Sequence, residues 1–111
     1  MIEKAYEILK TYFGYKEFRY GQKELVTNLI NGTDCVGIMP TGAGKSICYQ
    51  IPAILMDGIT LVISPLISLM KDQVHALLEA GIPAAYINSS LTPAQQYKVI
   101  QNAKQYKYKL I

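Results

Sequence analysis

Residues 39–46 read MPTGAGKS, and this stretch decides the fold. An apolar run at residues 35–39 precedes it and a helical pattern begins near Lys45, so the glycines lie where a buried strand turns into a helix. Gly42 and Gly44 can adopt backbone conformations that are closed to other residues, which lets successive amide N–H groups point at phosphate oxygens. The stretch therefore predicts a phosphate-binding loop between a strand and a helix.

The residue types in this loop have distinct chemical roles. Lys45 would bring a positive charge to the outer phosphates and Ser46 would offer its hydroxyl to a magnesium ion, so both are candidate catalytic residues. The strict pattern has glycine where this chain has Met39. The alternative is a glycine-rich turn that binds nothing, but a Lys-Ser pair at a helix start serves no packing need. The residues expected around the phosphates are Pro40, Thr41, Gly42, Ala43, Gly44, Lys45 and Ser46.

Helices and strands are predicted to alternate along the rest of the chain. Apolar residues recur every three or four positions in segments that end at Gly14, at Gly32 and at Gly81, and Thr92, Pro93 and Gln95 form a capping pattern before a helix that lasts to about Lys104. Another helix opens near Lys45 and contains Pro52, which should kink or shorten it. Apolar runs at residues 35–39, 59–63, 84–87 and 108–111 predict strands, and the second of these should be covered on both faces.

Strands separated by helices, with no hairpin signal, predict parallel βαβ units. The expected fold class is therefore α/β, with three α/β/α layers around a parallel sheet, the strand near Met39 central and the phosphate loop at its carboxyl end. The chain stops inside an apolar run, so the sheet is expected to be truncated. An apolar edge would then be exposed, and the chain would pair with another copy or aggregate.

Composition excludes several other classes of protein. Half of the 111 residues are hydrophobic and 17% are charged, which is not the composition of a disordered chain. Basic residues exceed acidic residues by three, a balance that is compatible with phosphate-bearing partners without deciding for them. Cys35 and Cys48 have no metal-ligand spacing and are expected to be reduced core thiols. No apolar stretch could span a bilayer, so we expect a cytoplasmic protein, nucleoid-associated if bacterial, without a membrane partner.

Segments downstream of the loop carry further motifs. Residues 45–52 read KSICYQIP, residues 63–74 read ISPLISLMKDQV and residues 87–89 read INS. These segments resemble the RecQ family of superfamily 2 helicases, with residues 63–74 like the family's motif Ia and residues 87–89 like the segment that follows that motif. Upstream of the loop, the cluster that resembles the family's motif 0 consists of Phe13, Gly14, Tyr15, Phe18, Arg19, Gly21 and Gln22. Within this motif the family usually has proline where this chain has Tyr20.

The resemblance implies a RecA-like P-loop NTPase lobe that uses ATP and Mg²⁺ for 3′ to 5′ unwinding of DNA in recombination and repair. Residues 1–31 would be N-terminal helices that carry the adenine-recognition motif, and residues 32–111 a partial lobe of the same structural domain. By the same resemblance, the Gln22 amide would bond the N6 and N7 edge of adenine while Tyr15 and Arg19 hold the ring. The partners implied are single-stranded DNA, a duplex junction and a second helicase lobe.

The resemblance also implies residues that hold a DNA backbone. The alternatives are that Ser64 is only a helix cap, that Lys71 lies on a solvated face, and that Arg19 and Gln22 are ordinary residues at a helix start. The tyrosines and lysines that alternate at residues 97–109 would either stack on and neutralise a nucleic-acid strand or belong to a solvated helix end and a sheet edge. The implied DNA-binding residues are Ser64, Pro65, Ser68, Lys71, Asn88 and Ser89.

Hydrolysis also needs carboxylates that hold magnesium and orient water, normally at the end of a buried strand. None of the eight acidic residues here ends a predicted strand, so we expect the chain alone to bind nucleotide weakly and not to turn it over. Two other functions share the phosphate loop. A P-loop kinase would need an acceptor pocket and a basic lid, and does not usually read adenine from upstream of the loop. A nucleotide-sensing module would lack catalysis altogether.

Overall fold

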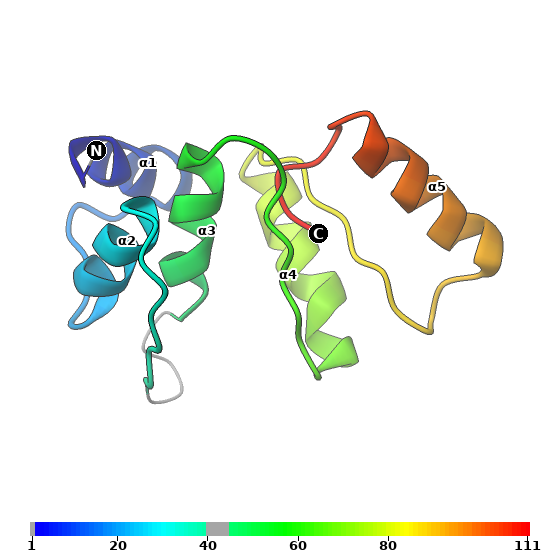
Figure 1. Cartoon of the computed structure of the whole chain (residues 1–111), viewed down its shortest axis with the longest axis horizontal. Coiled ribbons are helices and arrows are strands. Elements are labelled where there is room, and N and C mark those ends of the chain that lie inside the picture. The colour runs from blue at the N-terminus through cyan, green and yellow to red at the C-terminus, as the bar shows by residue number, and fades with distance from the viewer. Residues whose placement is uncertain (1, 40–44) are drawn as a thin grey trace. The chain divides into compact units, whose positions relative to one another are not determined.

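The computed structural model describes residues 2–39 and 45–111, and Figure 1 shows the five helices found within them. The chain divides into two compact units, Met1–Asp57 and Gly58–Ile111. The predicted division at residue 31 remains a prediction. The helices are α1 (Ile2–Phe13), α2 (Gln22–Ile30), α3 (Lys45–Leu55), α4 (Ile67–Glu79) and α5 (Pro93–Lys104).

The helix ends follow the local signals in the sequence. Gly14 follows α1 directly, and Gly32 and Gly81 lie two residues beyond the ends of α2 and α4. Their φ angles are 76°, 78° and 87°, the left-handed region in which glycine is not strained. The predicted capping box begins α5: the Thr92 hydroxyl accepts from the Gln95 amide at 3.2 Å, and the Thr92 amide donates to the Gln95 side chain at 2.9 Å. These predictions are confirmed.

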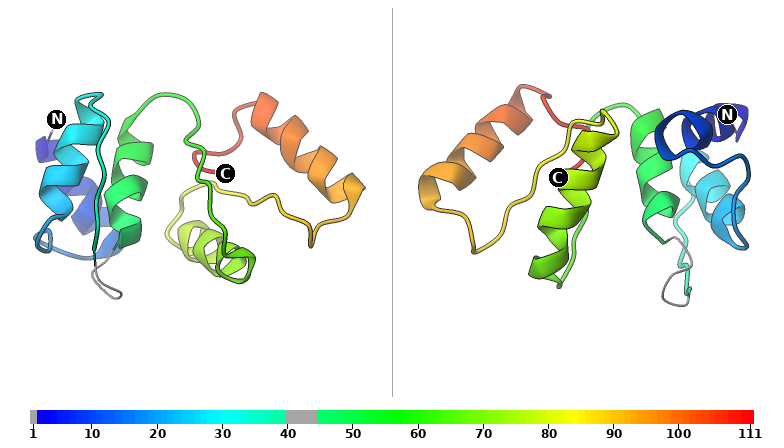
Figure 2. Two further views of the ribbon diagram at one scale, coloured as in Figure 1. Left: turned by 60° about the horizontal axis from the view of Figure 1, so that its bottom comes forward. Right: turned by 180° about the vertical axis from the view of Figure 1, so that it is seen from behind.

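In the unit Met1–Asp57, α3 packs against both α2 and α1, as the two views of Figure 2 show. Ala5 and Leu9 of α1, Val26 of α2 and Ile51 of α3 are fully buried together. The spacing of Ala5 and Leu9 places both on one helix face, which explains why that face packs inward. Among the partly buried residues around this core, the rings of Tyr6 and Phe18 meet edge to face, with centroids 4.9 Å apart.

The unit Gly58–Ile111 is joined by backbone hydrogen bonds that centre on Leu110. On one side, the amide of Thr60 donates to the Lys109 carbonyl at 2.9 Å and that of Ile111 to the Thr60 carbonyl at 3.1 Å. On the other side, the Ala85 amide donates to the Leu110 carbonyl at 3.2 Å. Leu110 therefore pairs in parallel with both Thr60 and Ala84. The parallel direction agrees with the predicted βαβ connections.

A continuous sheet is nevertheless absent from the described residues. Thr60, Ala84 and Leu110 form single pairings, and no segment within residues 2–39 and 45–111 forms a strand, so the predicted parallel sheet is not confirmed. The run at residues 59–63, predicted to be covered on both faces, leaves Leu61 73% exposed and Ile63 97% exposed. The physical reason is that residues 60–62 pair only with residues 109–111, which leaves one edge and one face of the run without a partner in this unit.

The segment at residues 35–39 is extended and lies against α2. A Cβ added at Gly37 would stand 2.4 Å from a terminal carbon of Leu25, so only glycine allows this approach without a shift of that side chain. Val36 and Ile38 are 87% and 94% exposed. Residues 35–39 therefore expose alternate apolar side chains, as one face of a strand does. Within the described parts of the chain, no helix is both long and apolar enough to span a bilayer.

Candidate functional site

The phosphate loop itself, Pro40, Thr41, Gly42, Ala43 and Gly44, lies outside the described residues, but both of its ends are described. Lys45 is exposed and is the first residue of α3, and Ser46 follows it half-buried. The first turn of α3 carries no acidic residue. Because the first amides of a helix have no partners within the helix, this end attracts anions. Lys45 and Ser46 therefore stand where the sequence predicts the phosphates.

Met39 connects the two sides of the loop. Its sulfur accepts a hydrogen bond from the thiol of Cys48, one turn into α3, at 3.8 Å. Its terminal methyl group lies 3.9 Å from the place where a Cβ of Gly21 would be. The turn before α2 and the first turn of α3 thus both lie near the residue that leads into the loop. The motif that resembles an adenine-recognition motif is therefore close to the start of the predicted phosphate loop.

Gln22 is the first residue of α2 and is only 1% exposed. Its side-chain oxygen accepts from the backbone amide of Arg19 at 2.7 Å, which fixes the turn between the two residues. The structure brings Gln22 and Arg19 together. Tyr15 is half exposed, and its amide donates to the Leu9 carbonyl at the end of α1.

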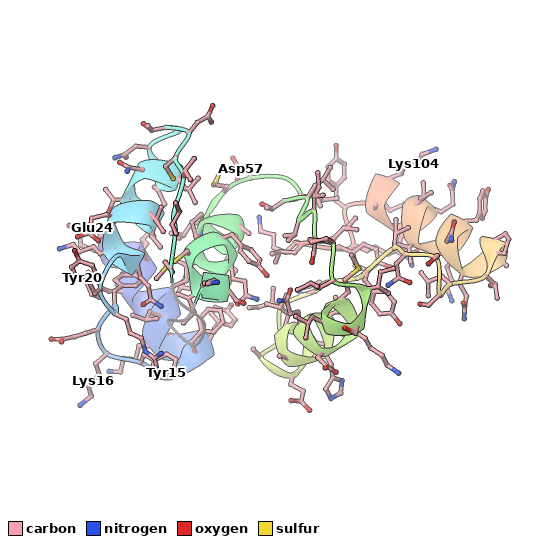
Figure 3. All side chains as sticks on the ribbon, turned by 90° about the horizontal axis from the view of Figure 1, so that it is seen from below. Tyr15, Lys16, Tyr20, Glu24, Asp57 and Lys104 are labelled. Atoms are coloured by element: carbon pink, nitrogen blue, oxygen red, sulfur yellow. The ribbon has the colours of Figure 1, made fainter. Side chains whose placement is uncertain are left out.

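An open hollow of about 500 Å³ lies beside this turn. Arg19, Tyr20 and Lys23 line it, together with Phe18 from the apolar side. Figure 3 shows Tyr20 on the outer side of the connection between α1 and α2, and its side chain is fully exposed. Neither Tyr15 nor Gln22 lines this hollow. Of the three residues predicted to hold adenine, only Arg19 therefore faces it.

The Cys48 thiol offers a direct check on the packing around Met39. Burial raises the pKa of this thiol, so a smaller fraction of it is thiolate at neutral pH than in a free cysteine. We expect iodoacetamide at pH 7 to label Cys48 at least about tenfold more slowly than Cys35, which is half-buried. Mass spectrometry of the labelled peptides measures both rates. Equal rates in the folded chain would contradict this packing, and equal rates in urea are the expected control.

The residues predicted to bind DNA gather around the start of α4. The Ser64 hydroxyl accepts from the Leu66 amide at 3.2 Å, so Ser64 shapes the turn that precedes α4. The N-cap of α4 is Leu66, without a side-chain cap, so Ser64 is not the helix cap of the alternative interpretation. Pro65, Ser68 and Lys71 are exposed at the same end of α4. Their side chains are accessible to a ligand.

Asn88 lies between α4 and α5. Its amide nitrogen donates to the Met70 sulfur of α4 at 3.5 Å, and its backbone carbonyl accepts from the Gln96 amide of α5 at 3.2 Å. Its side-chain oxygen accepts from the Ser90 amide at 2.9 Å. Ser89, next to it, is exposed. The structure thus brings residues 88–89 beside the turn of α4 that carries Ser68 and Lys71.

Magnesium would find only part of a binding site here. Mg²⁺ prefers oxygen ligands, and Ser46 supplies one hydroxyl beside the predicted phosphates. Residues 2–39 and 45–111 contain no group of three or more His, Cys, Asp or Glu side chains that could hold a metal ion. The described donors fit an ion that is held mainly by nucleotide phosphates and one hydroxyl, and they do not fit an ion held by protein carboxylates.

Met39 is the residue of this site that sequence reasoning missed. The sequence marks it only as a departure from the strict glycine pattern, whereas the structure places it against Gly21 and Cys48. Methionine is unbranched and fills irregular gaps, which suits this position between a turn and a helix. A signal was present in the sequence, because an apolar residue directly before the loop is available for packing.

Comparison with known proteins gives matches over most of the chain. The family model described as "DEAD/DEAH box helicase" matches residues 19–111. The chain is 57% identical to the ATP-dependent DNA helicase RecQ of Bacillus subtilis over 99% of its own length. It is 56% identical to the protein of the same name from Haemophilus influenzae over 89% of its length, and 44% identical to that from Synechocystis over 95%.

The chain covers 19%, 16% and 22% of these three relatives, so it spans only about a fifth of their length. The family match begins at Arg19 and includes both ends of the phosphate loop, the start of α4 and the Asn88 turn. The resemblance to RecQ helicases that the sequence motifs carry is confirmed by these relatives. The chain belongs to the DEAD/DEAH box helicase family.

Proposed function

We propose that this chain is the ATP-binding part of an ATP-dependent DNA helicase of RecQ type, which unwinds DNA in the 3′ to 5′ direction in recombination and repair. The observation that supports this most directly is the position of Met39, which bonds to Cys48 and lies near the turn at Gly21. It joins the turn that carries Arg19 and Gln22 to the helix that begins with Lys45. A single nucleotide can then be held by its base at the turn and by its phosphates at the helix.

In this proposal the RecA-like lobe has a parallel sheet to which residues 35–39 contribute a strand. Two observations support it. Residues 60–62 and 83–85 already pair in parallel with residues 109–111. Val36 and Ile38 expose an alternating apolar face that a sheet would cover. The match to the DEAD/DEAH box helicase family supports the RecA-like fold in general.

The nucleotide in this proposal is ATP, bound with Mg²⁺. Gly42, Gly44 and the first amides of α3 would bind the phosphates, Lys45 would neutralise the outer ones, and Ser46 would supply a ligand to the ion. Bound Mg²⁺ would neutralise charge on the phosphate oxygens. Ser64, Ser68, Lys71 and residues 88–89 are proposed to hold the DNA backbone, and a second lobe would complete the motor.

Gln22 tests the part of the proposal that selects adenine. An amide that accepts from N6 and donates to N7 meets a carbonyl oxygen in guanine, so Gln22→Ala should reduce the preference for ATP over GTP by roughly 2- to 10-fold, the value of one hydrogen bond. Competition of each nucleotide against a fluorescent ATP analogue measures this ratio. Because the ratio compares two ligands of the same folded protein, it is not changed by a lower folded fraction.

Gln22→Glu is the matched variant, since it keeps the oxygen that accepts from Arg19 and loses the donor. It keeps the acceptor of the Arg19 amide and should still lose selectivity, and circular dichroism checks that the buried carboxylate leaves α2 folded. Equal affinity of the unmodified chain for ATP and GTP would remove the adenine role of Gln22. A chain that binds no nucleotide at all would contradict the proposed function.

A further inference from the structure

Charge is distributed unevenly along this chain. All eight acidic residues lie at or before Glu79, so residues 80–111 carry four lysines and no acidic side chain. Four of the nine tyrosines lie in the same stretch. The modest net charge of +3 therefore hides a locally cationic, aromatic segment. Such a combination is typical of surfaces that bind nucleic acids.

Helix α5 separates this segment into two faces. Lys98, Val99 and Asn102 line a hollow of about 330 Å³ together with Ala84 and other residues of the same unit. Tyr97, Gln101 and Lys104 are spaced i, i+4 and i+7 and lie on the opposite side of the helix. Tyr97 is 66% exposed, and α5 has no fully buried residue. Figure 3 shows the Lys104 side chain extending away from the end of α5.

The helix α5 ends in a left-handed residue that is not glycine. Tyr106 has a φ of 56°, and among the described residues it alone adopts a positive φ without being glycine. Its amide donates to the Ala103 carbonyl at 2.9 Å and the Lys107 amide to the Asn102 carbonyl at 3.1 Å, the hydrogen bonds that end a helix in a left-handed residue. After the other four helices this conformation is adopted by Gly14, Gly32, Gly58 and Gly81.

Packing does not explain the tyrosine at this position. A left-handed conformation strains any residue with a Cβ, and a side chain that becomes buried can offset that strain. The Tyr106 ring is 79% exposed, so little burial compensates for it. Glycine would end the helix without strain, as it does elsewhere in this chain. A strained, exposed aromatic ring between Lys104 and Lys107 points to a ligand outside the fold.

We propose that Tyr97, Lys104, Tyr106 and Lys107 form a surface that binds single-stranded DNA. The two tyrosine rings would stack on unpaired bases, and the two lysines would neutralise backbone phosphates. We define these four residues as the α5 surface. A single strand is favoured over a duplex because the faces of paired bases are covered by their neighbours and cannot stack on a protein ring. The α5 surface includes none of residues 64–71 and 88–89, and this inference rests on the proposed function in DNA unwinding.

The spacing of Tyr97 and Lys104 along α5 suits a short stretch of single-stranded DNA. Tyr97 and Lys104 are seven residues apart on a helix, which is about 10 Å along its axis. One strand of DNA carries a phosphate about every 3.4 Å in a helical arrangement, so this length spans roughly three nucleotides. Lys109 is not part of the surface, because its ammonium group donates to the Gly58 carbonyl at 3.4 Å. Tyr108 is also excluded, since its hydroxyl accepts from the Asn102 amide at 3.0 Å.

Tyr106→Gly separates a role in binding from a role in structure. If the strained ring serves DNA, glycine should raise the melting temperature by roughly 2–4 °C, because relief of strain exceeds the added freedom of the unfolded chain. The same variant should weaken binding of a fluorescent 20-nucleotide oligo-dT about tenfold, the value of one stacked base. Tyr106→Phe keeps the ring and should bind like the unmodified chain. Tyr12→Ala, an exposed tyrosine on α1, is the matched control.

The salt dependence of binding tests the lysines independently. Each phosphate contact to a single strand contributes about 0.7 to the slope of log affinity against log salt, so Lys104→Ala with Lys107→Ala should lower that slope by about 1.4. A lower melting temperature for Tyr106→Gly, unchanged affinity for oligo-dT, an unchanged slope, or tighter binding of duplex DNA would each overturn the inference. ATP binding is measured in parallel. If the unmodified chain does not bind ATP, the proposed function is contradicted. If it binds both ATP and DNA and the variants bind DNA equally well, only the α5 surface is overturned.

Discussion

Replacing Lys45 with alanine should weaken ATP binding by about 10- to 100-fold. Hydrogen bonds to charged groups are worth roughly 1.5–3 kcal/mol, and each 1.4 kcal/mol is tenfold in affinity. Lys45 is exposed at the first position of α3, and no other cation occurs between Lys23 and Lys71 in the sequence. No neighbouring residue along the chain can therefore take over its charge. Equilibrium binding of a fluorescent ATP analogue measures the effect.

Lys10→Ala is the control for the general loss of a positive charge. Lys10 is exposed in the last turn of α1 and has no proposed role at the phosphates. This variant should bind ATP like the unmodified chain, and circular dichroism should show both variants to be folded. Unchanged ATP affinity in Lys45→Ala would refute the assignment of residues 39–46 as a phosphate-binding loop.

The second prediction with a large expected effect is that the chain alone does not hydrolyse ATP. We expect the 111-residue chain, tested alone, to release no measurable phosphate from ATP, with or without DNA. In-line attack needs carboxylates that hold magnesium and orient water, and a cation on the developing charge that alone is worth about a thousandfold or more. None of the eight acidic residues ends a predicted strand, and the described residues hold no cluster of metal-ligating side chains. We therefore expect the chain to bind phosphates without completing the reaction.

The measurement is a phosphate-release assay on purified chain at saturating ATP. A contaminating ATPase would give a signal that persists in Lys45→Ala, so this variant is measured beside the unmodified chain. Phosphate release that DNA stimulates and that Lys45→Ala abolishes would show that the missing groups are not required. If a longer protein that includes this sequence turns over ATP while the chain does not, the expectation is met.

Helices were predictable from the sequence because their determinants are local. Gly14, Gly32 and Gly81 end helices in left-handed positions, and the Thr92 and Gln95 pair forms a capping box within one turn. A sheet depends instead on pairing between segments far apart in the chain, which no local pattern determines. The sequence accordingly predicts extended runs near Thr60, Ala84 and Leu110 and their parallel direction, but not that they meet in single pairings.

The candidate site was predictable in part. The start of α3 at Lys45 follows from the residue types that phosphate binding requires, whereas the loop at residues 40–44 lies outside the described residues and stays a prediction. The burial of Gln22, the contacts of Met39 and the exposed face of the run at residues 59–63 depend on how elements pack, which a single sequence does not specify. Tyr106 could not have been found from its pattern, because glycine is the residue that normally signals a left-handed helix end.

The pairing of Leu110 with both Thr60 and Ala84 has a consequence for synthesis on the ribosome. Lys109 bonds to the carbonyl of Gly58, 51 positions earlier in the chain. Bringing such distant segments together carries a loop-closure cost before any contact repays it, so folding of this kind is slow. The N-terminal unit can close as soon as α3 has left the exit tunnel. The segments at residues 60–62 and 83–85 must stay unpaired until residues 109–111 emerge, and during that interval their backbone groups are open to a chaperone or to wrong pairing.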